Sequence, residues 1–76
     1  MKGSEIEIGG WYWFFNAWHG YVVMGQAKDH FIEGGGAETA ERILFHKIVN
    51  TDGSYARLSP TDETSVVPSD IIKKVG

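Results

Sequence analysis

The sequence contains no cysteine and only two prolines among its 76 residues. Without cysteine the chain can form neither disulfides nor thiolate metal sites, which agrees with a reducing compartment. A chain of this length has room for one hydrophobic core, so we expect a single domain over residues 1–76. Such a domain buries only about 60 % of the surface that its unfolded chain exposes. Its stability must therefore come from large side chains or from association with a partner.

The sequence also lacks an excess of basic residues and a long apolar run. Seven Lys and Arg against ten Asp and Glu give a net charge of -3. We therefore do not expect nucleic-acid binding or attraction to anionic lipid. The most apolar stretch, residues 11–24, is interrupted by Asn16, His19 and Gly20 and is too short and polar to span a bilayer. Acidic residues at positions 5 and 7 also argue against a signal peptide. We expect a cytoplasmic protein without membrane contact.

The first third of the sequence predicts a β-hairpin. Residues 5–8 alternate acid and isoleucine, and residues 11–15 are five aromatic side chains in succession. These residue types favour strands, and the glycines at positions 9 and 10 favour a sharp bend, as at a barrel corner. We predict one bent strand over residues 5–15, a turn at 16–20 and a second strand at 21–27.

The middle of the sequence leaves helix and strand both open. The glycine triplet at 34–36 is predicted to be the tip of a long, mobile loop. Residues 37–47 have helical spacing, but apolar residues also alternate between positions 43 and 49. We favour a strand over 42–49, preceded by a short helical turn. The turn signal at 50–53 then predicts pairing with a strand at 55–59.

The C-terminal segment Val67-Pro68-Ser69-Asp70-Ile71-Ile72 predicts a proline-led turn before a closing strand. Proline cannot sit in a central ladder, and Ser69 or Asp70 can cap one short helical turn. The segment resembles the hydrophobic-Pro-Ser-Asn-Tyr-Val ending of SH3 domains. The resemblance implies a mainly β, SH3-like, partly open small barrel of about five strands, with room for one short helix or helical turn.

A second pattern, Tyr21-x-Val23-x-Gly25-x-Ala27 followed later by a hairpin and Arg57, is similar to short bacterial SH3-like domains. It implies a bacterial or phage protein. Both resemblances imply fold only, because function depends on the site that a fold carries. In peptide-binding SH3 domains a tyrosine of the ligand groove occupies the position of Ile71, so recognition of proline-rich peptides does not carry over.

Eight of the ten aromatic residues fall between positions 11 and 31. On an extended strand Trp11, Trp13 and Phe15 point to one face, and Tyr12 and Phe14 point to the other. A small barrel has one interior, so at least one set should lie outside it or cap a barrel end. Two or three exposed rings approach the roughly 300 to 600 Å² of the largest apolar patch on a typical monomer. The predicted binding residues are Trp11, Trp13, Phe15, Trp18 and Tyr21.

We predict no catalytic residue, metal ligand or cofactor. His19, His30 and His46 lack the close spacing of metal-binding pairs. The glycine triplet lacks the Lys-Ser/Thr that completes a phosphate loop. Tyr55 and Arg57 could form a stacking site for single-stranded nucleic acid, but nearby acids favour a solvated β-face.

Three functions remain open. The leading hypothesis is a small non-enzymatic interaction module that uses its aromatic surface to bind a protein partner or a second copy of itself, as a homodimer. The second is a subunit of an oligomeric small-barrel enzyme whose site forms on assembly, as in the small SH3-like dihydrofolate reductases carried on plasmids. The third is an inhibitor protein of a phage or mobile element.

Overall fold

The computed structural model describes residues 1–16, 20–36, 38–50 and 63–76, without the side chains at positions 38 and 50. These residues form five strands and two short 3-10 turns, and thus the predicted mainly β fold is confirmed. In chain order the elements are η1 (Gly3–Glu5), β1 (Trp11–Asn16), β2 (Tyr21–Gly35), β3 (Glu38–Asn50), β4 (Thr64–Val66), η2 (Pro68–Asp70) and β5 (Ile71–Lys74).

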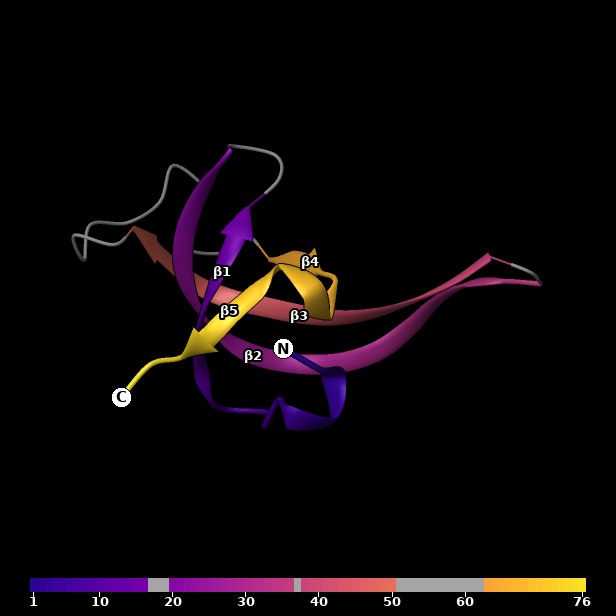
Figure 1. Cartoon of the computed structure of the whole chain (residues 1–76), viewed down its shortest axis with the longest axis horizontal. Helices are drawn as coiled ribbons and strands as arrows, with labels where there is room; N and C mark the ends of the chain where they lie inside the picture. Colours follow the sequence, from indigo (N-terminus) through magenta and orange to yellow (C-terminus); the bar gives the residue numbers. More distant parts are fainter. Residues whose placement is uncertain (17–19, 37, 51–62) are drawn as a thin grey trace.

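The strands form one antiparallel sheet in the order β4-β3-β2-β1-β5. The long strand β2 connects its two halves, because its first part pairs with β1 and almost its whole length pairs with β3. Beyond this body the far ends of β2 and β3 continue as a two-stranded arm (Figure 1). Among the described residues, none belongs to a helix long and apolar enough to cross a membrane.

The core lies between the two halves of the sheet and is built around Phe45. The Phe45 ring stacks on Phe14, with ring centroids 4.3 Å apart, and meets Tyr12 edge-on at 6.3 Å. Gly25 on β2 leaves space for this stack, since a Cβ at that position would lie 3.1 Å from the Phe14 ring. The buried apolar residues are Tyr12, Phe14, Val23, Ala27, Ile43, Phe45, Ile48, Val66 and Ile71.

The prediction of one bent strand over residues 5–15 is wrong in its first half. Only Trp11–Asn16 is a strand, and it is preceded by the 3-10 turn η1 and a tight turn at the two glycines. Gly9 has a φ of 93°, which favours glycine, and Gly10 N–H donates to the carbonyl of Glu7 at 3.0 Å. Glu7 N–H in turn donates to the Tyr12 hydroxyl at 2.8 Å. The two glycines therefore lie in a turn that precedes the strand, and not at a bend within it.

The glycine triplet closes a hairpin instead of a long loop. Strands β2 and β3 stay paired up to Gly35 opposite Glu38, so Gly34 and Gly35 belong to β2. Gly34 and Gly36 have positive φ values of 95° and 70°, which suits a tight connection between antiparallel strands. The triplet is a tip, as predicted, but the prediction of a loop around it is wrong.

The choice between helix and strand over residues 37–47 is resolved in favour of a strand. Strand β3 begins at Glu38, four residues before the predicted start, so residues 38–41 are strand and do not form the predicted helical turn. Ile43 and Phe45 are fully buried while Leu44 and His46 between them are only half-buried, as a two-residue period requires. Lys47 is exposed, although the helical spacing would place it on the same stripe as Ile43 and Leu44. The predicted turn at 50–53 and strand at 55–59 lie largely outside the described residues, and β3 pairs with β4 through residues 43–45.

A β-bulge in β3 places Lys47 in the left-handed region, with a φ of 53°. Met24 pairs with Val49 and Gln26 pairs with His46, so β3 supplies two residues opposite Gly25 alone. A left-handed backbone costs a side-chain-bearing residue roughly 1 to 2 kcal/mol. The bulge is thus a local source of strain.

Relieving this strain should stabilise the protein. We expect Lys47→Gly to raise the free energy of unfolding by about 0.5 to 1 kcal/mol, after the entropy cost of an extra glycine is subtracted. Urea denaturation followed by circular dichroism measures the change. Lys47→Ala is the control, because it removes the same side chain but keeps the strain, and it should give no gain. An equal gain in both variants would contradict the explanation.

The predicted turn and closing strand at the C-terminus are confirmed as η2 and β5. The predicted cap is wrong, because neither Ser69 nor Asp70 precedes the turn. Val67 holds the cap position, without a side-chain hydrogen bond, and Asp70 N–H donates to its carbonyl at 2.9 Å. Pro68 at the first position of the turn needs no donor there, which explains why a side-chain cap is dispensable.

Candidate functional site

Strand β1 separates its five rings between two faces, as the sequence predicts. Tyr12 and Phe14 are fully buried in the core. Trp11 and Trp13 are half-buried, and Phe15 is 40 % exposed. The domain therefore fills its core with one set of rings and leaves the other set on its surface.

The exposed rings share their face with apolar residues from both neighbouring strands. On β2, Met24 lies opposite Trp13 and Val22 lies opposite Phe15. On β5, the apolar neighbour is Ile72, whose side chain is 51 % exposed. We call this surface the outer aromatic face and define it by Trp11, Trp13, Phe15, Val22, Met24 and Ile72. Because all six side chains stand on paired strands, the backbone holds them in fixed positions.

A shallow hollow of about 390 Å³ lies on the outer aromatic face. It is lined by Trp13, Val22, Ile72 and Lys73. Lys73 lies opposite Trp13 on the neighbouring strand and makes no ion pair or hydrogen bond with the described part of the chain. The hollow thus combines an apolar floor with one ammonium group that is available to a partner.

The charge of the adjacent lysine, Lys74, is already paired with a carboxylate. Lys74 Nζ lies 3.0 Å from a carboxylate oxygen of Glu7. The hydrogen bond that Lys74 donates to this carboxylate, together with the negative charge of Glu7, raises the pKa of Lys74. The two consecutive lysines of β5 therefore differ: the ammonium group of Lys74 is in an ion pair, whereas that of Lys73 lines the hollow and can pair with a partner.

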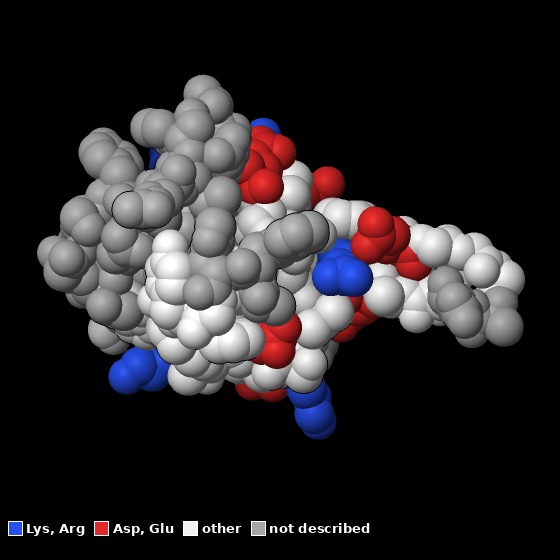
Figure 2. All heavy atoms as spheres, turned by 90° about the horizontal axis from the view of Figure 1, so that it is seen from above, with Lys and Arg blue, Asp and Glu red and all other residues white. Residues whose placement is uncertain are grey.

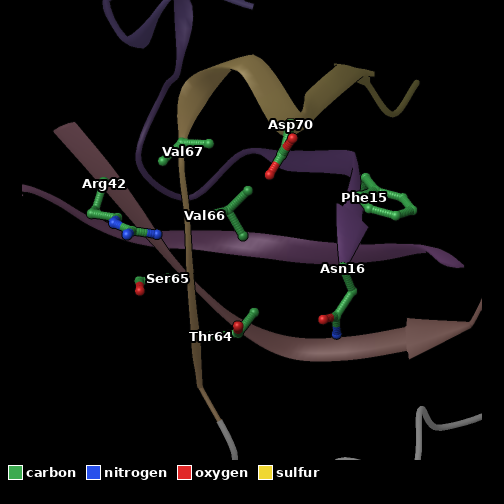
Figure 3. A pocket seen from close by; sticks show the side chains of 8 residues that line it. All are labelled: Phe15, Asn16, Arg42, Thr64, Ser65, Val66, Val67 and Asp70. Carbon is green, nitrogen blue, oxygen red and sulfur yellow. The ribbon is translucent and has the colours of Figure 1, made fainter. Parts of the chain in front are cut away.

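A second, smaller hollow of about 90 Å³ lies beside β4 and η2 (Figure 3). Arg42 and Asp70 approach it from opposite sides of Val66. Arg42 Nε lies 3.0 Å from a carboxylate oxygen of Glu33, so its charge is compensated. The Asp70 carboxylate has no ion-pair partner within the described ranges. The lining residues are Phe15, Asn16, Arg42, Thr64, Ser65, Val66, Val67 and Asp70.

Phe15 connects the two hollows. It lines the smaller one and lies opposite Val22, which lines the larger one. The surface around them carries charges of both signs. Where the described residues are visible in Figure 2, acidic and basic side chains are interspersed rather than gathered by sign.

The structure brings together three of the five predicted binding residues. Trp11, Trp13 and Phe15 lie on the outer aromatic face. Tyr21 is 37 % exposed but lies opposite Asn16, whose side chain is buried, so the register assigns it to the other face. Trp18 lies outside the described residues.

Four residues of the outer aromatic face and its hollow were not predicted from the sequence. Val22 and Met24 could have been found, because they alternate with the buried Val23 and lie across the hairpin from the exposed rings. Ile72 and Lys73 could not, since a register shift between Trp13 and Phe14 sets which β5 side chains reach the face.

The histidines in the described ranges make pairwise contacts on separate parts of the sheet. His30 Nε2 lies 3.0 Å from a carboxylate oxygen of Glu41, and His46 Nε2 lies 3.0 Å from the amide oxygen of Gln26. Within those ranges no three His, Asp or Glu side chains cluster as metal ligands would. Both contacts join strands β2 and β3, so each supports the pairing of the long hairpin.

Comparisons with protein-family models, with curated proteins and with solved structures find no significant match to this chain.

Proposed function

We propose that this protein is a small non-enzymatic interaction module that binds a protein partner through its outer aromatic face. The observation that carries the proposal is the division of the β1 rings, with Tyr12 and Phe14 completing the core while Trp13 and Phe15 remain on the surface. We further propose that the sheet is an SH3-like small barrel and that the protein acts in the cytoplasm. The five antiparallel strands and the proline-led turn before β5 support the fold assignment.

Exposed apolar area gives this face its binding free energy. Phe15, Val22 and Ile72 are 40 %, 36 % and 51 % exposed, and the half-buried tryptophans add to them. With roughly 150 to 250 Å² for each large ring, the described face presents on the order of 300 to 400 Å². Burial contributes about 25 cal/mol per Å², so covering this area favours binding by roughly 8 to 10 kcal/mol before association costs. That is enough for a specific, reversible complex.

The residue types and their support also suit binding. Tryptophan is enriched among residues that dominate binding energy at protein interfaces. Trp13 stands between β2 and β5, opposite Met24 on one side and Lys73 on the other. Because both neighbours are strands of the same sheet, little conformational freedom is left to lose when a partner binds. A partner therefore meets a preformed surface.

Selection of peptide ligands tests the proposal. A phage-displayed library of random peptides is panned on the wild-type protein and counter-selected on Trp13→Glu. Sedimentation equilibrium then measures the self-association of the wild type and of Trp13→Glu. We expect Trp13→Glu to weaken whichever association is found at least tenfold, because it places a charge in the apolar hollow.

Lys47→Glu is the matched control, since it introduces the same side chain at an exposed position on β3. It should leave association unchanged. The proposed function is wrong if neither peptides nor a second copy binds in a Trp13-dependent way while circular dichroism shows that Trp13→Glu is folded.

A further inference from the structure

Resting on the proposed function, we propose that the partner of the outer aromatic face is a second copy of this chain. The two copies would pair about a two-fold axis near Ile72, with Asp70 of each copy against the partner's Lys73. The charges, the shape and the size of the surface along η2 and β5 support this pairing.

Asp70, which lines the smaller hollow, and Lys73, which lines the larger one, carry opposite charges and flank Ile71 and Ile72 along the chain. Neither side chain has an ion-pair partner within the described ranges, although Lys28, Arg42 and Lys74 each have one there. In a two-fold interface, if one residue contacts a second residue of the other copy, the second contacts the first in return. A two-fold axis midway between Asp70 and Lys73 therefore forms two ion pairs at once and leaves neither charge uncompensated.

The shape of the face is also self-complementary. Ile72 projects, with 51 % of its side chain exposed, and it borders the hollow formed with Trp13 and Val22. A projection and a hollow on the same surface are what two identical copies need in order to interlock. With the axis near Ile72, the projecting side chain of each copy reaches the hollow of the other.

The size of the face limits the strength of the pair. Stable complexes bury about 800 Å² on each partner, roughly twice the apolar area presented by the described face. We therefore expect a reversible dimer with a dissociation constant on the order of 10 to 100 µM rather than an obligate one. The net charge of -3 on each copy opposes association and also favours a weak dimer over an obligate one.

Charge exchange tests the pairing directly. Sedimentation equilibrium should show a monomer–dimer equilibrium for the wild type. Asp70→Lys and Lys73→Asp should each weaken the dimer about tenfold, because each places like charges in contact. An equimolar mixture of these two variants should recover dimers, since the exchanged charges attract across the interface. The double variant should recover them by itself.

Neutral variants cover the case in which a charge reversal fails to fold. Asp70→Asn and Lys73→Gln should each weaken the dimer about threefold, and Lys47→Glu should leave it unchanged. A chain that stays monomeric at every concentration while binding peptides through Trp13 would overturn the second copy as partner and leave the proposed function standing. A dimer that ignores the charge exchange would overturn this pairing. Absence of any Trp13-dependent association would overturn both proposals.

Discussion

Phe45→Ala is expected to unfold a large fraction of the protein in water. Phe45 is fully buried and contacts both buried rings of β1, stacking on Phe14 and meeting Tyr12 edge-on. Truncating a core phenylalanine to alanine costs about 3 to 5 kcal/mol. A domain of this size has a total stability of roughly 4 to 11 kcal/mol. Urea denaturation followed by circular dichroism should therefore show a transition shifted close to zero denaturant, or no folded baseline.

The control for this prediction is Phe31→Ala on the projecting arm. Phe31 is half-buried, lies opposite Arg42 on a two-stranded ribbon and is not among the core residues. We expect it to cost less than about 1 kcal/mol. If both variants lost the same free energy of unfolding, the core would not be centred on Phe45.

The second large effect distinguishes two neighbouring residues of β1. Phe14→Gln places an amide in a fully buried site among apolar side chains, where an unpaired polar group costs several kcal/mol in addition to the lost packing. We expect no stable fold from it. Trp13→Gln places the same side chain on the outer aromatic face, where water can solvate the amide. There we expect a loss of only about 1 to 2 kcal/mol from the buried part of the indole.

Much of the fold could be predicted because strand periodicity is a local property. Phe14 and Trp13 point to opposite faces of any strand, whatever surrounds it, so the division of the rings followed from the sequence alone. The turn at Pro68 was predictable for the same reason, since proline excludes its own position from a central ladder. Local steric rules fix such features before any tertiary contact forms.

Features set by contacts between segments could not be predicted. Residues 5–8 alternate like a strand, but the backbone turns there and donates a hydrogen bond from Glu7 to the Tyr12 hydroxyl. The glycine triplet favours a loop in the sequence because glycine disfavours strands, whereas pairing between β2 and β3 extends the hairpin to Gly35. The contribution of Ile72 and Lys73 to the site depends on a register shift between β1 and β5. Each of these outcomes depends on a contact with another segment, five residues away in the turn, across the hairpin tip for the glycines, and distant in sequence for β5.

The most direct test of the account is the free energy of unfolding of Phe14→Gln beside that of Trp13→Gln, measured by urea denaturation and circular dichroism. Phe14→Gln should have no cooperative transition, while Trp13→Gln should unfold cooperatively and keep more than half of the wild-type stability. Equal losses in the two variants, or a folded Phe14→Gln, would show that the rings of β1 are not divided between a core and a binding surface.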